Sequence, residues 1–160
     1  MSLWSRPATR ALLLATATAG VLDLVAAFVL AALAGAGPGR VLAVISSGLL
    51  GARAEPGPGT ALLGTLAHFG IMLVIAGVYP GAARRLPRLG SRPWLAGPLY
   101  GMLVYLVMQY VVLPLSAYPY PPAGSPLQIA QGLLVHATCV GLPIALIARA
   151  ALRREPRPTA

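Results

Sequence analysis

The sequence has few charged residues, and most of them are arginine. Only 9% of its 160 residues are charged, whereas an average soluble domain has about 25%. It contains no lysine, and its only acidic residues are Asp23, Glu55 and Glu155. Hydrophobic residues make up 58% of the chain, and the mean hydropathy is +0.78. This composition excludes an ordinary water-soluble domain, because too few polar residues are present to cover so much apolar surface.

Cysteine and catalytic motifs are also scarce. Cys139 is the single cysteine, which excludes an intramolecular disulfide and a Cys-x-x-Cys metal or redox pair. The sequence has no Gly-x-Ser-x-Gly and no His-Glu-x-x-His motif, and it places no base near Ser47. Hydrolytic catalysis is therefore the least favoured functional class, and we favour a protein that is not an enzyme.

Four long apolar segments are the main feature of the sequence. A bilayer core about 30 Å thick needs about 20 apolar residues of helix. The first segment is longer than a signal-peptide core of roughly 7–15 residues, so we expect it to be retained. The sequence predicts one all-α integral membrane domain, a four-helix bundle with helices at 11–34, 60–83, 93–115 and 127–148.

A fifth apolar stretch, 41–52, lies between the first two predicted spans. At 1.5 Å per residue a helix of this length reaches only about 18 Å, too short to cross. Its pattern is mildly amphipathic, with Leu42 and Ile45 on one side and Ser47 on the other. We therefore expect a short interfacial or re-entrant helix.

The distribution of arginine predicts the orientation in the membrane. Arg40 and Arg53 fall on one side of the bilayer, and the other ten arginines fall on the opposite side. Because positive residues collect on the cytoplasmic side, we expect both termini in the cytoplasm of a bacterial inner membrane. No basic face is interleaved with exposed aromatic residues, so we expect the lipid bilayer and not nucleic acid as the partner.

Small residues and caps indicate how the helices pack. The motifs Gly77-Val-Tyr-Pro-Gly81 and Gly97-Pro-Leu-Tyr-Gly101 are spaced for close helix contact, which we expect within one bundle in preference to a dimer interface. Ser125-Pro-Leu-Gln128 predicts a capping box at the start of the last helix. We expect Ser46 and Ser47 to bond to their own helix backbone, and the helices to kink at Pro80, Pro98, Pro114 and Pro143.

Each predicted span carries one strongly polar residue: Asp23, His68, Gln109 or His136. With the expected orientation they lie roughly 16, 12, 9 and 14 Å below the outer boundary, all in the outer half of the membrane. Each shares a helix face with small or polar residues, as Gln109 does with Tyr105. We therefore predict one polar ligand-binding cluster, open to the outer side, formed by Asp23, His68, Tyr105, Gln109 and His136.

A purely structural role is the alternative for this cluster. Interhelical hydrogen bonds contribute roughly 0.6 to 2 kcal/mol and can simply fix the helix register. Gln109 suits this role best. Asp23 suits it least, because a carboxyl group in the membrane needs either a partner such as His68 or His136 or protonation that keeps it neutral.

Several functions fit these residues. The first is binding or conduction of a small solute, ion or proton, in which transport would require a homo-oligomer because no inverted repeat is present. The second is a structural or assembly partner of a larger membrane complex. The third is a redox protein with a bis-His haem at His68 and His136, or a metal site formed by these two and Asp23. No cofactor motif supports the third, and we expect no cofactor.

Several short motifs between Gly20 and Ala148 form a recognisable pattern: Leu22-Asp23, Arg40-Val-Leu, Ser47-Gly-Leu-Leu-Gly51, Leu66-Ala-His68-Phe69, Val111-Val-Leu-Pro-Leu-Ser-Ala117, His136 and Gly141-Leu-Pro-Ile144. In these motifs the chain resembles a family of small, functionally uncharacterised bacterial inner-membrane proteins. The resemblance implies four transmembrane helices and no particular activity. The family has asparagine where Gln109 stands, which argues against an exact geometric role for that residue.

Overall fold

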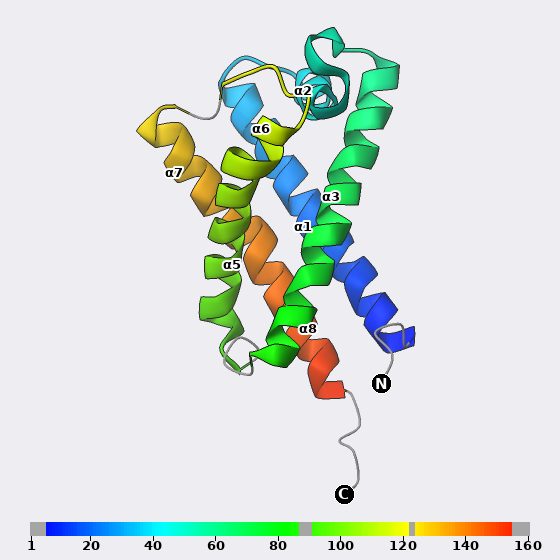
Figure 1. The fold of residues 1–160 in the computed structure, drawn as a ribbon, viewed down its shortest axis with the longest axis vertical. Coiled ribbons are helices and arrows are strands. Elements are labelled where there is room, and N and C mark those ends of the chain that lie inside the picture. The colour runs from blue at the N-terminus through cyan, green and yellow to red at the C-terminus, as the bar shows by residue number, and fades with distance from the viewer. Residues whose placement is uncertain (1–5, 87–90, 122–123, 155–160) are drawn as a thin grey trace, which may run out of the picture.

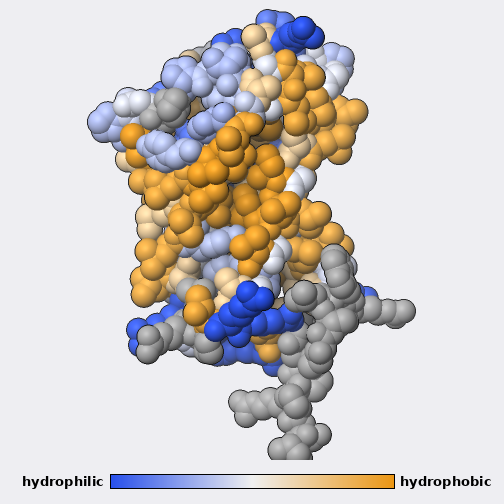
Figure 2. Space-filling model, viewed as in Figure 1, coloured by the Kyte–Doolittle hydropathy of each residue, from blue (hydrophilic) through white to orange (hydrophobic). Residues whose placement is uncertain are grey.

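The computed structural model describes residues 6–86, 91–121 and 124–154, and every regular element in these ranges is a helix. Four helices are long and apolar enough to cross a membrane, and they confirm the four predicted segments with ends that differ by a few residues. On the face shown in Figure 2, a mostly hydrophobic zone covers the middle of the molecule between two more hydrophilic ends. The four helices are Ala8–Leu33, Pro58–Arg85, Pro93–Leu115 and Pro126–Arg153.

Two of these long helices are single elements and two are composite. The single elements are α1 (Arg6–Leu33) and α3 (Pro58–Arg85). The third helix consists of α5 (Pro93–Val107), the π-helical segment η2 (Met108–Val112) and α6 (Leu113–Leu115). The fourth helix consists of α7 (Pro126–Val135), the π-helical segment η3 (His136–Gly141) and α8 (Leu142–Arg154).

The two ends of the molecule differ in what they contain. The start of α1, the end of α3, the start of α5 and the end of α8 lie at one end, which we call the arginine end (Figure 1). The short helix α2 (Pro38–Leu50) and the start of α7 lie at the other, which we call the α2 end. The four long helices alternate in direction, so the last one ends at the end of the molecule where the first one begins.

Proline marks the start of four helices. Pro38, Pro58, Pro93 and Pro126 stand in the first turns of α2, α3, α5 and α7, where the missing N–H costs no hydrogen bond. The predicted capping box of α7 is confirmed. The hydroxyl of Ser125 accepts from the Gln128 backbone N–H at 3.1 Å, and the Gln128 side chain accepts from the Ser125 N–H at 3.3 Å.

Proline later in the helices has two different effects. Pro80 and Pro98 lie inside α3 and α5, which continue through them. Pro114 and Pro143 instead follow the π-helical segments η2 and η3 closely. Proline cannot donate to the carbonyl four residues earlier and its ring crowds that carbonyl, so a wider turn before it relieves the clash.

The fourth helix occupies the centre of the packing. The helix α5 lies along η3 and α8, and α1 lies between α8 and α3. A side chain at Gly101 would collide with the backbone carbonyl of His136. A side chain at Gly97 would also collide, with the backbone at Gly141 and Leu142. The prediction of packing within one chain is therefore confirmed for Gly97 and Gly101.

The second glycine motif does not make a close contact. Gly77 is exposed, and a side chain there would only touch Leu12 at an ordinary 3.9 Å. Gly81 has no neighbouring atom within 4 Å of the position of a Cβ. The spacing of small residues at Gly77 and Gly81 therefore predicted a close contact wrongly, because spacing alone does not show which face a neighbouring helix covers.

The short helix α2 crosses over α3 and is followed by a 3-10 turn, Gly51–Arg53. Gly64 of α3 allows this close approach, because a side chain there would collide with the backbone carbonyl of Leu42. The Ala117 N–H donates to the Gly48 carbonyl at 3.0 Å and ties α2 to the end of the third helix. The helix α2 thus covers the gap between α3 and the third helix at this end.

The face that α2 buries is small and polar. Ser46 and Ser47 are fully buried, and their hydroxyls donate to the carbonyls of Ala43 and Val44 at 2.8 and 2.7 Å, as predicted. Leu49 is 62% exposed, on the outside of the molecule. Because the serines satisfy their hydroxyls within their own helix, the serine face can pack as a small surface and leave leucine outside.

We predict that Gly101→Ala lowers the free energy of unfolding by about 1–3 kcal/mol, because the added methyl group forces α5 away from His136. Gly77→Ala is the matched control and should leave stability unchanged or raise it by about 1 kcal/mol through helix propensity. Thermal unfolding of the purified variants measures both. Equal stability of the two variants would contradict the close approach at Gly101.

Candidate functional site

Two adjoining cavities lie toward the α2 end. The larger, the inner chamber, has a volume of about 550 Å³ and is lined by α2, α3, the third helix and parts of α1 and η3. The smaller, the side cavity, has about 290 Å³ and lies between α1, the third helix and the fourth helix. Asp23 and His136 line both cavities, so they stand where the two adjoin.

The five predicted site residues are distributed over these two cavities. Asp23, His68 and His136 line the inner chamber. Tyr105 and Gln109 line the side cavity, again with Asp23 and His136. The structure thus brings the predicted residues to neighbouring surfaces and separates them into two overlapping groups.

His68 is held in one orientation by α1. Its side chain is only 7% exposed, and its Nε2 lies 2.9 Å from the Gly20 carbonyl oxygen. Because Gly20 has no side chain, the Phe69 ring can occupy that space, with its Cε1 2.6 Å from the position of a Cβ. The missing side chain therefore permits the close contact between α1 and α3. A carbonyl oxygen can only accept, so Nε2 carries the hydrogen and Nδ1 of the neutral ring is an acceptor.

His136 is oriented in the same manner by its own helix. It begins η3, and its Nδ1 lies 3.0 Å from the carbonyl oxygen of Gly132. Its ring meets the Tyr105 ring edge-on, with centroids 5.3 Å apart, and Tyr105 packs into the space that Gly132 leaves. Here Nδ1 carries the hydrogen, and Nε2 of the neutral ring is the acceptor.

Asp23 is half-buried and does not pair with the histidines. Both histidines use one ring nitrogen on a backbone carbonyl instead. Within the part of the chain that the structure describes, the Asp23 carboxylate has no hydrogen bond or ion pair. Of the two alternatives for Asp23, a histidine partner is therefore not observed, and an acceptor with no protein donor stands at the junction of the two cavities.

The α2 end of the inner chamber is formed by the loop after the third helix. The Ser116 hydroxyl donates to the Leu113 carbonyl at 2.8 Å and accepts from the Tyr118 N–H at 3.1 Å. Burial raises the pKa of Tyr118, and the neighbouring Tyr120 raises it further, so the phenol keeps its proton. This loop therefore places the neutral hydroxyl of Tyr118, and no charged group, at the chamber.

Two buried hydroxyls have no partner in the described structure, and one of them lies at the site. They belong to Thr16 of α1 and to Tyr105 of α5, which is 4% exposed and lines the side cavity. Gln109 lies in η2, half-buried, at the same cavity. A buried hydroxyl without a partner costs stability, and such a cost is typical of a site where a ligand or water completes the bonding.

Sequence reasoning missed several lining residues. Gln128 and Gln131 of α7 line the side cavity, and Ser116 and Tyr118 line the inner chamber. Gln131 could have been found as a polar residue inside an apolar segment. In the sequence Gln128 is recognisable only as part of a helix cap, because its tertiary neighbours are not visible there.

The described residues contain no group of three or more His, Cys, Asp or Glu side chains that could hold a metal ion together. His68, His136 and Asp23 share a chamber and yet do not form a three-ligand set. Comparison with protein-family models, curated proteins and solved structures found no match for this chain. Membership in the family that the sequence resembles therefore stays a prediction.

We predict that Tyr105→Phe leaves stability unchanged or raises it by up to about 1 kcal/mol, because it removes a buried hydroxyl without a partner. Tyr100→Phe is the matched comparison: it removes the 2.7 Å bond to the Ile75 carbonyl and should lower stability by about 1 kcal/mol. Thermal unfolding of both variants gives the difference. A clear loss of stability in Tyr105→Phe would show that its hydroxyl is bonded.

Proposed function

We propose that this protein is a multi-pass membrane protein that binds a small ligand in the inner chamber, with Asp23, His68 and His136 as the recognition groups. The observation that carries the proposal is the Asp23 carboxylate, which adjoins two cavities and has no partner among the described residues. A carboxylate in a membrane protein interior costs several kcal/mol unless it is paired. A ligand that donates to Asp23 offsets that cost.

The size and lining of the inner chamber support binding. Ligand pockets have volumes of about 300–1,000 Å³ and are mostly apolar with a few convergent polar groups. The chamber, at about 550 Å³, has this composition, with Ile71, Met72 and Val74 beside the three recognition groups. The histidines are fixed in orientation by their backbone bonds, so their acceptors are preorganised.

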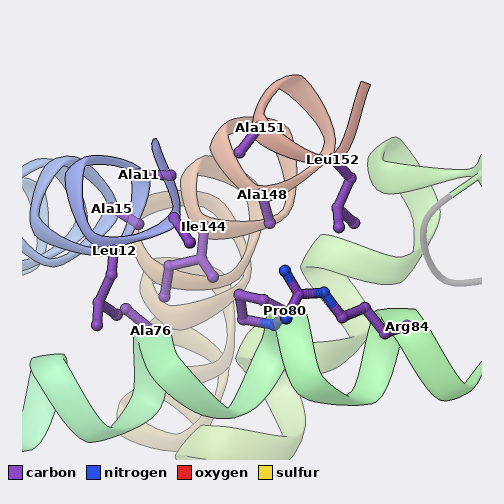
Figure 3. Close-up of a pocket in the computed structure, with 11 residues that line it drawn as sticks. Ala11, Leu12, Ala15, Ala76, Pro80, Arg84, Ile144, Ala148, Ala151 and Leu152 are labelled. Carbon is purple, nitrogen blue, oxygen red and sulfur yellow. The ribbon is translucent and has the colours of Figure 1, made fainter. Parts of the chain in front are cut away.

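Binding is favoured over conduction because a packed layer separates the chamber from the arginine end. Ala76, Val140, Ile144 and Ala145 are completely buried in one cluster. Beyond this cluster lies a small cavity of about 50 Å³, bounded by Pro80 with the Arg84 guanidinium folded back over it (Figure 3). A path for ions or protons would have to cross this packed layer, in which the described polar side chains are the tyrosines Tyr79 and Tyr100 and no side chain is charged.

A role as an assembly partner through its glycine faces receives less support. Gly97 and Gly101 are already covered by the fourth helix, which leaves only Gly77 and Gly81 of the two glycine motifs free for docking. The bis-His haem alternative also receives less support, because Nε2 of His68 is engaged by the Gly20 carbonyl. Ligand binding is therefore the function that the arrangement favours.

The proposal includes a bacterial inner-membrane location with both termini in the cytoplasm. Ten of the 12 arginines fall at the arginine end by sequence position, which favours that end as the cytoplasmic one. We propose that α2 lies at the outer interface without crossing, since 13 residues reach only about 20 Å and its exposed Leu49 suits lipid. The inner chamber then lies in the outer half of the membrane.

The orientation can be tested with single cysteines in a Cys139→Ser background. Glu55→Cys, after α2, should react with an impermeant maleimide on intact cells, whereas Leu86→Cys, at the end of α3, should react only after permeabilisation. Both positions are exposed in the structure. The reverse labelling pattern would overturn the proposed orientation.

For the site we predict that Asp23→Asn folds with a change in stability of no more than about 1 kcal/mol, because asparagine is nearly isosteric and carries no charge. A panel of short and long alcohols, amines and carboxylates is screened by thermal unfolding. At 100 times its Kd a binding compound should stabilise the unchanged protein by about 2.7 kcal/mol, and Asp23→Asn should lose this stabilisation.

Thr138→Val is the matched control for this measurement. It is also nearly isosteric, its hydroxyl bonds only to the Leu134 carbonyl of its own helix and the neighbouring Cys139, and it lines neither cavity. It should keep the stabilisation by ligand. If no compound stabilises the unchanged protein, or if Asp23→Asn keeps the full effect, the proposed site is wrong.

A further inference from the structure

The inner chamber continues sideways into a groove between α3 and the third helix. This lateral groove has a volume of about 390 Å³, and its lining surface is apolar. It shares five lining residues with the chamber, so the two form one continuous space: Ile71, Val74, Ile75, Met108 and Val112. A polar compartment with an attached apolar one has the shape of a site for an amphiphile.

The groove exists because α3 and α5 scarcely touch. The helix α5 lies against the fourth helix through its glycines and not against α3. Tyr100 bridges the gap, with its hydroxyl donating to the Ile75 carbonyl at 2.7 Å and its ring 5.1 Å from the Tyr79 ring. This bridge limits the groove toward the arginine end.

The groove opens to the side of the molecule. Val74, Val78 and Leu103 line it and are 66%, 54% and 55% exposed, within helices that are apolar enough to cross a membrane. At the α2 end, by contrast, α2 and its bond between Gly48 and Ala117 cover the chamber. Lateral entry from the bilayer is therefore the wider route.

Most of the polar groups in the wall of the chamber are acceptors, and the Tyr118 hydroxyl is the donor among them. Asp23 is a carboxylate, and the nitrogens left over on neutral His68 and His136 are acceptors because their N–H groups donate to backbone carbonyls. The Ser116 hydroxyl likewise gives its hydrogen to a carbonyl. Among the described residues no arginine lines the chamber, the lateral groove or the side cavity. An anionic head would meet Asp23 with no positive partner.

We infer that the ligand is a single-chain amphiphile whose head donates hydrogen bonds, a hydroxyl or a protonated amine, and that it enters sideways from the bilayer. The chain lies in the lateral groove, and the head donates to Asp23 and the histidine nitrogens. This inference rests on the proposed function and adds the class of ligand. An acidic head, such as a fatty carboxylate or a phosphate, is disfavoured by the acceptor wall.

The test uses the purified full chain in phosphatidylcholine nanodiscs with a hexadecanol probe that carries a diazirine in its chain. After illumination, mass spectrometry should locate adducts on the lateral groove, at Ile71, Val78 and Leu103. Unlabelled hexadecanol or hexadecylamine should compete, and palmitate should compete about tenfold less well. The difference between competition by hexadecanol and competition by hexadecylamine shows whether the site prefers a hydroxyl head or an ammonium head.

Two variants test separately how the chain and the head of the ligand are bound. Val78→Trp should fill the groove and reduce labelling about tenfold. Val29→Trp is the matched control, because Val29 is 53% exposed on α1 and lines none of the three spaces. Thermal unfolding should show that both tryptophan variants fold alike. Asp23→Asn should reduce labelling in the same way as Val78→Trp.

Three results would overturn the inference. If Asp23→Asn abolishes binding of a short-chain alcohol or amine but Val78→Trp changes nothing, the proposed function stands and the ligand is not an amphiphile. If Val78→Trp reduces labelling while Asp23→Asn does not and palmitate competes equally, the groove holds ordinary lipid. If the probe fails to label and Val78→Cys forms a disulfide-linked dimer, a second copy of the chain fills the groove.

Discussion

The contact between α5 and the fourth helix determines much of the remaining architecture. Because Gly101 has no side chain, the α5 backbone lies directly on the carbonyl of His136. This contact holds α5 on one side of the fourth helix, while α1 and α3 pack on another. The helix α5 makes its close contacts with the fourth helix, and it scarcely touches α3. The inner chamber and the lateral groove are the consequence of this choice of neighbour.

The sequence predicted the elements well, because their causes are local. Apolar length determined the four spans, and the first-turn proline and Ser125 determined the start of α7. The backbone bonds of Ser46 and Ser47 were predictable for the same reason. The π-helical segments were not predicted. They require a proline and also a neighbouring helix that accepts the wider turn, and only the proline is visible in the sequence.

The candidate site was predicted in its residues but not in its geometry. Polar side chains in apolar segments are conspicuous, so Asp23, His68 and His136 were identified, and the structure places all three on one chamber. The bonds that these side chains make were not predicted, since the sequence left open whether a histidine pairs with Asp23, and neither histidine does. The carbonyls that bind the histidines belong to Gly20 and Gly132. Whether a backbone carbonyl lies within reach depends on packing that hydropathy does not encode.

The distribution of contacts also bears on how the chain assembles in the membrane after insertion. The segment from α1 to α3 is joined within itself by Phe69 over Gly20 and by α2 over Gly64, and the segment from α5 to α8 by Gly101 against His136. The two segments meet chiefly where α1 lies on the fourth helix. Each segment is thus a helical hairpin that can fold as soon as it enters the bilayer. Association of the two hairpins then creates the inner chamber, which neither hairpin contains alone.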